Sequence, residues 1–215
     1  MRTEDSAYAE RLDRLESVWW KRLLDVQRPY RWHLRALRLG RVLDLGCGLG
    51  RNLINLGGGD AGVGVDHNAE SVAVARSRGL TAYLPDEFRA SPHAIPGSFD
   101  ALLVAHVLEH LPWGEAVGLV RSYLPFVRAG GRVVLITPQE AGFRADPTHV
   151  EPVDFGALRR LAAELGLRVL RTYSFPFPRP VGLVFKYNES VLLAAVPESG
   201  FGGGSGGVGG ASGSS

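Results

Sequence analysis

The sequence has 215 residues, of which 45% are hydrophobic, and its formal net charge is +2 at pH 7. This length and apolar content predict one domain with a substantial core. The small net charge does not favour a nucleic acid or another polyanion as partner, and we expect none. Cys47 is the one cysteine, so an internal disulfide is excluded and a reducing compartment is favoured.

The sequence carries no recognisable targeting or membrane signal. Residues 1–16 are rich in charge and lack the apolar core of a signal peptide. No apolar run approaches the roughly 18 residues that a bilayer-spanning helix needs. We therefore expect a cytoplasmic protein without a transmembrane segment.

Two helical segments are predicted before residue 40. Leucine and tryptophan recur at helical spacing over about residues 5–26, which predicts an amphipathic helix. Pro29 begins a second piece, and one face of it is basic, with Arg28, Arg31, Arg35 and Arg38. This face is either solvated or in contact with a bound carboxylate. Four aromatic side chains are expected in the core rather than in a pocket wall: Trp19, Trp20, Tyr30 and Trp32.

A strand, a glycine turn and a helix are predicted at residues 42–56. Residues 42–45 are mostly apolar and favour a buried strand of a parallel sheet. Three glycines follow at alternate positions, and helical spacing then resumes. This order of elements is typical of sites that hold a nucleotide at a helix N-terminus, because glycine lets the ligand lie against bare backbone.

The glycine spacing discriminates between nucleotides. A dinucleotide pattern, G-x-G-x-x-G, would place its third glycine at position 51, which is Arg51. The observed pattern is acidic-x-Gly-x-Gly-x-Gly, which resembles motif I of the class I S-adenosylmethionine-dependent methyltransferases. The resemblance implies S-adenosyl-L-methionine as methyl donor. The residues of this motif that it implies at the cofactor are Asp44, Gly46, Cys47, Gly48 and Gly50.

The resemblance also implies how the domain is organised. Methyltransferases of this type often place a helical cap over the site from the segment before motif I. Residues 1–39 are expected to form that cap, with Arg31 or Arg28 meeting the methionine carboxylate of the cofactor. Residues 40–198 are expected to form the cofactor-binding domain. Residues 199–215 are almost entirely Gly and Ser and are expected to be disordered.

Asp66 is the next candidate cofactor ligand. Residues 61–65 predict a second strand, and Asp66 ends it about 20 residues after the first glycine, as expected for a carboxylate that binds both ribose hydroxyls. Helix capping is the alternative role. His67, beside it, is also expected at the cofactor. Asn68 is expected to cap a helix whose packing face holds Val72, Ala73 and Ala75.

A third strand is predicted at residues 80–84. The resemblance implies an acidic residue after it that hydrogen-bonds the adenine amino group. Asp86 is our choice, with Phe88 covering the ring, and an ordinary loop carboxylate is the alternative. Residues 89–97 are expected to be a surface loop.

The fourth predicted strand, residues 98–104, leads into a second motif. Ala105-His106-Val107-Leu108-Glu109-His110-Leu111-Pro112 follows it, and many small-molecule methyltransferases of this class have F-D-x-(apolar run)-H-V-L-E-H-L-P here. The resemblance then covers about residues 40–137, and it is specific for the superfamily but says nothing about the acceptor. It implies that Ala105 and His106 contact the cofactor.

The remaining elements complete an α/β fold. We expect helices over about 115–127 and from Asp154, and strands over 132–137, 167–173 and 190–196. Together these predict a doubly wound, seven-stranded, mostly parallel sheet with the last strand antiparallel, plus the N-terminal helical cap. The turn at 175–185 is rich in proline and aromatics. It lines a substrate entrance, makes a dimer contact or touches a membrane.

The chemistry expected of the site is an in-line methyl displacement, in which alignment is the main task of the protein. A general base is needed only if the acceptor loses its proton during attack. The candidate side chains are His149, our first choice, and then His106, His110 and Glu109. They either shape the pocket, act as base, or hold a divalent metal. Ubiquinone-pathway O-methyltransferases and small-RNA 3′-end methyltransferases are similar here but have Glu-x-x-Glu-His. This chain has His106 for the first Glu, and we predict no metal.

The sequence thus predicts S-adenosylmethionine-dependent methyl transfer to an oxygen or nitrogen of a small-molecule acceptor. One alternative is a metal-assisted O-methyltransferase, and another is a non-catalytic S-adenosylmethionine-binding module. A nicotinamide-dependent oxidoreductase is disfavoured by Arg51. An Asn-Pro-Pro-aromatic motif is absent after the fourth strand, which disfavours transfer to the amino groups of bases. A homodimer is left open.

Overall fold

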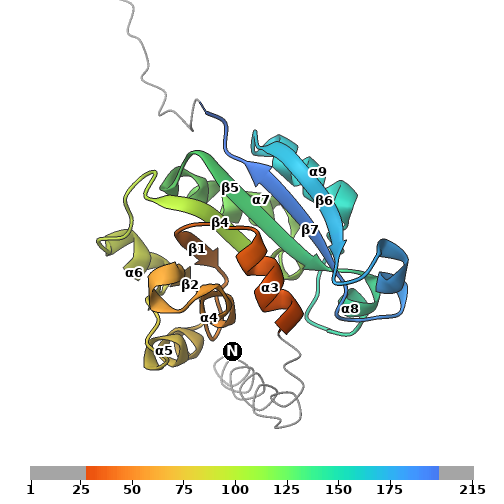
Figure 1. Ribbon diagram of the computed structural model, residues 1–215, viewed down its shortest axis with the longest axis horizontal. Coiled ribbons are helices and arrows are strands. Elements are labelled where there is room, and N and C mark those ends of the chain that lie inside the picture. The colour runs from red at the N-terminus through yellow and green to blue at the C-terminus, as the bar shows by residue number, and fades with distance from the viewer. Residues whose placement is uncertain (1–27, 199–215) are drawn as a thin grey trace, which may run out of the picture.

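The computed structural model describes residues 28–198, which form a seven-stranded sheet with helices on both faces (Figure 1). The strand order is β3-β2-β1-β4-β5-β7-β6. All neighbours pair in parallel except at β7, which is antiparallel to both β5 and β6. The strands are β1 (Val42–Leu45), β2 (Gly62–Val65), β3 (Ala82–Tyr83), β4 (Phe99–Ala105), β5 (Val127–Pro138), β6 (Arg168–Phe175) and β7 (Glu189–Ala195). The predicted fold class is confirmed.

The helices connect these strands in the doubly wound manner. The α-helices are α3 (Arg28–Ala36), α4 (Arg51–Leu56), α5 (Ala69–Ser77), α6 (Pro85–Ala90), α7 (Trp113–Tyr123), α8 (Glu140–Arg144) and α9 (Phe155–Glu164). Short 3₁₀ turns are η1 (Gly59–Ala61), η2 (Leu108–His110), η3 (Leu124–Phe126) and η4 (Arg179–Leu183). None of the helices between residues 28 and 198 is long and apolar enough to cross a membrane.

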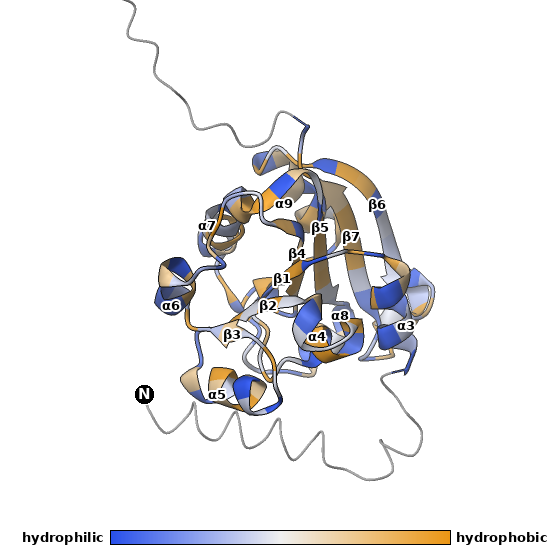
Figure 2. Ribbon diagram, turned by 60° about the vertical axis from the view of Figure 1, so that its left-hand side comes forward, coloured by the Kyte–Doolittle hydropathy of each residue, from blue (hydrophilic) through white to orange (hydrophobic). Residues whose placement is uncertain are grey.

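The two faces of the sheet bury different cores because side chains alternate along each strand. On β4, Leu102 and Val104 pack toward α7 and α9, whereas Leu103 packs toward α3. In Figure 1, α3 crosses the front of the sheet while α7 and α9 lie behind it. Hydrophobic residues run along the central strands in Figure 2, as expected for strands covered on both faces.

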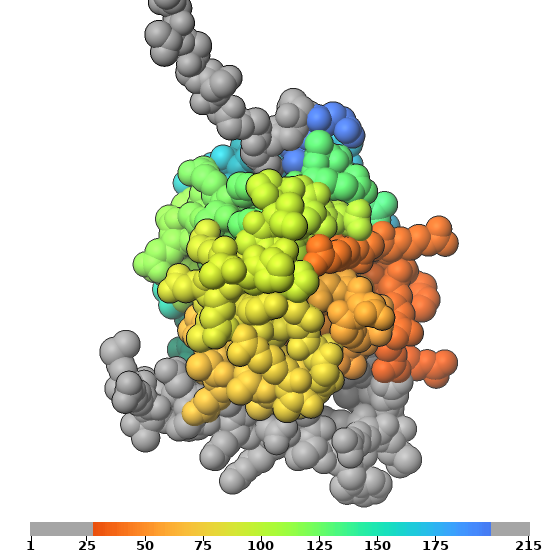
Figure 3. Space-filling view, turned by 90° about the vertical axis from the view of Figure 1, so that its left-hand side faces the viewer, coloured from red at the N-terminus to blue at the C-terminus, as the bar shows by residue number. Residues whose placement is uncertain are grey.

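The segment that runs from α5 to α6, which includes the edge strand β3, lies on the face of the molecule seen in Figure 3. Asn68 caps α5, since its side chain accepts a hydrogen bond from the backbone N–H of Ser71, as predicted. Val72 and Ala75 pack inward as expected, but Ala73 is exposed because it lies on the opposite side of the helix. Phe88 is fully buried against other aromatic rings on the α7 side, so its expected contact with an adenine ring is wrong.

Three other predictions need correction. Pro125 helps end α7 early, and Val127 therefore starts β5 instead of finishing a helix. The short helix α8 follows the fifth strand, where no helix was predicted before the one at Asp154. The side chain of Trp32 is 68% exposed rather than part of the core, because it lies on the outer face of α3. Trp19, Trp20 and the helix expected over 5–26 lie outside the described residues, as does the tail 199–215.

The carboxyl ends of the parallel strands lie at one edge of the sheet, which is where ligands bind in open α/β sheets. Because β7 runs antiparallel, its first residue, Glu189, lies at this same edge, paired with Pro138 and Phe175. The edge therefore combines the ends of β1, β2, β4 and β5 with the start of β7.

Candidate functional site

The glycine turn joins β1 to α4 and leaves one stretch of backbone open. Gly46, Gly48 and Gly50 all have positive φ angles, of 74°, 51° and 82°. A Cβ atom at Gly50 would lie 2.0 Å from Leu80 Cδ1, so packing requires glycine there. A Cβ at Gly48 would have nothing within 4 Å. The backbone at Gly48 is thus accessible to a ligand.

Asp66 ties the end of β2 to this turn. Its Oδ2 accepts a hydrogen bond from Gly48 N at 2.8 Å, and its Oδ1 accepts one from Asn68 N at 2.9 Å. A carboxylate has about four acceptor positions, so two are left for a ligand. His67 is largely exposed, and its Nδ1 lies 3.5 Å from Asp66 Oδ1.

Asp44 provides an unusual buried acceptor beneath the turn. Its Oδ1 accepts a hydrogen bond from Asn52 Nδ2 at 3.1 Å, whereas Oδ2 has no partner among the described residues. Burial, reinforced by the nearby Asp66 carboxylate and opposed by the Asn52 hydrogen bond, raises the pKa of Asp44 to about 7. An orphaned carboxylate oxygen at this place fits a cationic ligand group.

His106 ends β4 in a left-handed backbone conformation, with φ 58°, which is uncommon outside glycine. Its Nε2 lies 2.9 Å from Glu189 Oε1, and its Nδ1 lies 3.4 Å from Glu109 Oε1. Burial alone would lower the pKa of His106, but these two carboxylates together raise it to about 10. The imidazole is therefore a positioned cation at neutral pH and not a free base.

A cavity of about 280 Å³ opens beside His106. It is enclosed by α3, α4, the carboxyl ends of β4 and β5, and the start of β7. Its lining residues are Tyr30, His33, Leu34, Arg51, Asn52, Asn55, Ala105, His106, Ile136, Lys186, Tyr187 and Glu189. Because Arg51 and Asn52 directly follow the glycine turn, the cavity adjoins it.

Lys186 and Tyr187, at the end of the segment between β6 and β7, form one wall of this cavity. Asn188 is fully buried and fixes the turn: its Nδ2 donates to Gln139 Oε1 at 2.9 Å, and its Oδ1 accepts from Phe177 N at 2.9 Å. The Tyr30 hydroxyl donates to the Tyr187 carbonyl at 2.6 Å and joins α3 to the turn. None of residues 175–185 lines the cavity, so the three roles left open for that turn stay predictions.

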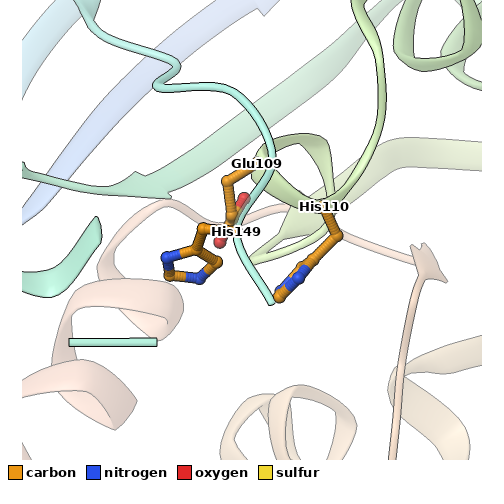
Figure 4. A group of neighbouring side chains, drawn as sticks. All are labelled: Glu109, His110 and His149. Carbon is orange, nitrogen blue, oxygen red and sulfur yellow. The ribbon is translucent and has the colours of Figure 1, made fainter. Parts of the chain in front are cut away.

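A second cluster of ionisable side chains lies next to the His106 ion pairs and shares Glu109 with them. Glu109, His110 and His149 each offer a ligand atom, and these atoms lie within 4.8 Å of one another (Figure 4). Glu109 is fully buried, and neither of its carboxylate oxygens has a hydrogen-bond partner among the described residues. His149 Nδ1 donates to the Phe143 carbonyl at 2.8 Å, which leaves Nε2 available as an acceptor.

The structure brings only some of the expected site residues together. The glycine turn, Asp44, Asp66, Ala105 and His106 lie along one edge of the sheet. Arg31, His110 and His149 do not line the cavity, and Asp86 is exposed in the first turn of α6. The ligand-binding and catalytic roles of all these residues stay predictions. Of the cavity-lining residues, only Ala105 and His106 were predicted at the site; those that sequence reasoning missed include Tyr30, Lys186, Tyr187 and Glu189.

Comparisons with known proteins agree with this geometry. A family model described as "Methyltransferase domain" matches residues 42–131. The fold is similar to that of a SAM-dependent methyltransferase from Archaeoglobus fulgidus, with a TM-score of 0.62 and 18% identity, covering 83% of this chain and 98% of that chain. The family-model match and the shared fold support a class I S-adenosylmethionine-dependent methyltransferase.

Two further methyltransferases are similar to this chain. The magnesium protoporphyrin IX methyltransferase of Synechocystis, solved with bound SAH, has a TM-score of 0.56 and 17% identity, over 80% of this chain and 85% of that one. A ubiquinone biosynthesis O-methyltransferase of Bordetella pertussis is 29% identical over 153 residues. That match covers 62% of this methyltransferase chain and 61% of its relative, so the chain spans less than two thirds of the relative's length.

Proposed function

We propose that this methyltransferase transfers the methyl group of S-adenosylmethionine to an oxygen of a small-molecule acceptor. The main support for this proposal is the cavity of about 280 Å³, which adjoins the glycine turn and reaches the end of β4 at His106. Transfer to a nitrogen of the acceptor is the alternative. Oxygen is favoured because the Bordetella pertussis relative is named an O-methyltransferase.

The residues around the turn fit the cofactor. Asp44 Oδ2 would accept from the ammonium group of its methionine part, and Asp66 from its ribose hydroxyls. The open space over Gly48 lets the ligand approach bare backbone. When bound, S-adenosylmethionine supplies a methyl group already activated by its sulfonium. Arg31, His67, Cys47 and Asp86 are kept as further candidate contacts.

We propose that the Glu189 carboxylate is the base that takes the proton of the acceptor hydroxyl. Its carboxylate lines the cavity and is held by His106 at 2.9 Å. As the acceptor oxygen forms its bond to the methyl carbon, the carbon–sulfur bond breaks and its electron pair stays on sulfur. The acceptor proton passes to the Glu189 carboxylate. His149 is the rival base from sequence reasoning, although it does not line the cavity.

Calorimetry and a transfer assay test this function. Titration with S-adenosylmethionine, S-adenosylhomocysteine and NAD should show binding of the two sulfur nucleotides only. Methyl transfer to a panel of hydroxylated small molecules should then fall strongly in Glu189→Gln and little in His149→Ala. Binding of S-adenosylhomocysteine without transfer to any panel member would instead favour the non-catalytic module.

A metal-assisted reaction is the second candidate, and one observation favours it. The buried carboxylate oxygens of Glu109 accept no hydrogen bond among the described residues, and Oε1 lies 3.4 Å from His106 Nδ1. Glu109 also lies beside His110 and His149, and this donor set suits a divalent transition metal. Glu109, His110 and His149 would hold the ion, whereas His106 lies between Glu109 and Glu189. A bound ion would supply Lewis acidity toward an acceptor oxygen.

This second candidate predicts loss of activity on chelation and tight Zn²⁺ or Mn²⁺ binding in calorimetry. His149→Ala should weaken that binding at least tenfold, since it removes one of three ligands. Full activity in a chelator, with no measurable metal binding, would eliminate it.

A further inference from the structure

The charges that line the cavity are unbalanced. Arg51 and Lys186 are basic, and Glu189 is its one acidic lining residue among the described residues. The Glu189 carboxylate is already paired with His106 at 2.9 Å. Within residues 28–198, neither Arg51 nor Lys186 forms an ion pair with a carboxylate. The cavity therefore offers positive charge to whatever it binds.

The two basic residues lie on different walls. Arg51 directly follows Gly50 and opens α4, so it belongs to the cofactor side. Lys186 comes from the turn before β7, on the wall that also carries Glu189. Its ammonium lies 4.9 Å from the centre of the Tyr187 ring. Lys186 is thus the cation that can reach an acceptor.

The segment that carries Lys186 is fixed by packing. A Cβ at Gly142 would lie 2.6 Å from the Lys186 carbonyl oxygen, so α8 presses directly against this backbone. Asn188, two residues later, is fully buried and hydrogen-bonded to Gln139 and to Phe177. The backbone that carries Lys186 is therefore held in place by these contacts.

The size and the remaining lining restrict the acceptor further. About 280 Å³ lies near the lower end of the range for small-molecule pockets, roughly 300 to 1,000 Å³. The apolar lining comes from Leu34, Ala105 and Ile136, and aromatic rings come from Tyr30 and Tyr187. These surfaces suit one planar ring better than an extended polar molecule.

We propose that the acceptor is a single-ring aromatic hydroxy acid, whose carboxylate is bound by Lys186 and whose hydroxyl lies at Glu189. The inference rests on the proposed function and adds the charge and size of its substrate. A carboxylate on Lys186 forms an ion pair in which both partners are charged, whereas a neutral amide of the same shape offers the ammonium only an uncharged acceptor. Lys186 is therefore the residue that selects acid over amide.

The test uses the full chain saturated with S-adenosylhomocysteine. Calorimetry compares the ortho, meta and para hydroxybenzoates with their primary amides, which match them in shape. At least one acid should bind tenfold or more tightly than its amide. Lys186→Gln should abolish that preference and Lys186→Arg should keep most of it. Arg160→Gln, which removes a positive charge from α9 far from the cavity lining, should change nothing.

Kinetics give a second reading in the same variants. With an acid that is methylated, Lys186→Gln should raise KM for the acceptor at least tenfold and leave KM for S-adenosylmethionine unchanged. Equal binding of acids and amides, or no binding of any acid, would overturn the acidic acceptor while leaving the methyltransferase function standing. Failure of S-adenosylhomocysteine itself to bind would overturn both.

Discussion

Replacing Asp44 by asparagine should stabilise the ligand-free protein at neutral pH. Asp44 is fully buried, and its pKa is raised from the ordinary value of 3.8 to about 7, chiefly by burial. Between these two values the folded state keeps a proton that the unfolded state has lost. Stability contributed by this group therefore falls as the pH rises through that window.

The magnitude follows from the width of the window. The interval from 3.8 to about 7 is about three pH units, and each unit corresponds to about 1.4 kcal/mol. Ionising Asp44 in the folded protein thus costs about 4 kcal/mol above pH 7. The neutral amide of the Asp44→Asn variant would avoid this cost, while its side-chain oxygen keeps the bond from Asn52 Nδ2.

The assay is urea unfolding of the ligand-free wild type and Asp44→Asn from pH 4 to pH 8. The free energy of unfolding of the variant, relative to wild type, should increase by about 4 kcal/mol across this range. S-adenosylhomocysteine affinity should show the opposite pattern: it should rise with pH in the wild type, because the ionised carboxylate binds the ammonium, and stay flat in the variant. A stability difference that does not change with pH would refute the reasoning.

Three further substitutions test separate parts of the site. Gly48→Ala should cost only about 1–2 kcal/mol of stability, from its positive φ, yet prevent S-adenosylhomocysteine binding in calorimetry; normal binding would show that the ligand does not lie there. Asp66→Ala should weaken the same binding at least tenfold, and urea unfolding should also show a loss of about 1–3 kcal/mol, since Gly48 N and Asn68 N lose their acceptor. Glu189→Gln should lower kcat strongly and change the KM for S-adenosylmethionine less. An unchanged kcat would show that Glu189 is not the proton acceptor.

The arrangement of the glycine turn and Asp66 was predictable because its signals are local in the sequence. The three glycines follow a strand directly, and Asp66 stands at a fixed spacing that the parallel sheet imposes. β1 and β2 are adjacent strands, so both of their carboxyl ends reach the same place. Predicting this arrangement required no strand pairing between segments that are distant in the sequence.

The acceptor half depends on pairing between distant segments. Glu189 reaches the site only because β7 runs antiparallel, which puts its first residue beside the end of β5. One signal in the sequence could have placed Glu189 at the site. It is a single glutamate directly before the apolar run at 190–196, which was predicted to be an antiparallel strand. Lys186 and Tyr187 follow from the same turn, whose path is set by buried Asn188.

The histidines show a different limit. In a regular helix the i, i+3, i+4 spacing would put His106, Glu109 and His110 on one face. His106 instead adopts a left-handed backbone, and its imidazole lies between Glu109 and Glu189. The grouping of His110 with His149 needs the loop after α8 to fold back onto η2. Neither effect leaves a pattern in the local sequence.

Calorimetric titration of the wild-type chain with S-adenosylhomocysteine tests the central claim most directly. We expect one molecule bound per chain, with binding weakened at least tenfold in Asp66→Ala and absent in Gly48→Ala. Arg160→Gln, with its charge removed from the surface of α9, should bind as the wild type does. No heat of binding to the wild type, or equal affinity in all the variants, would contradict it.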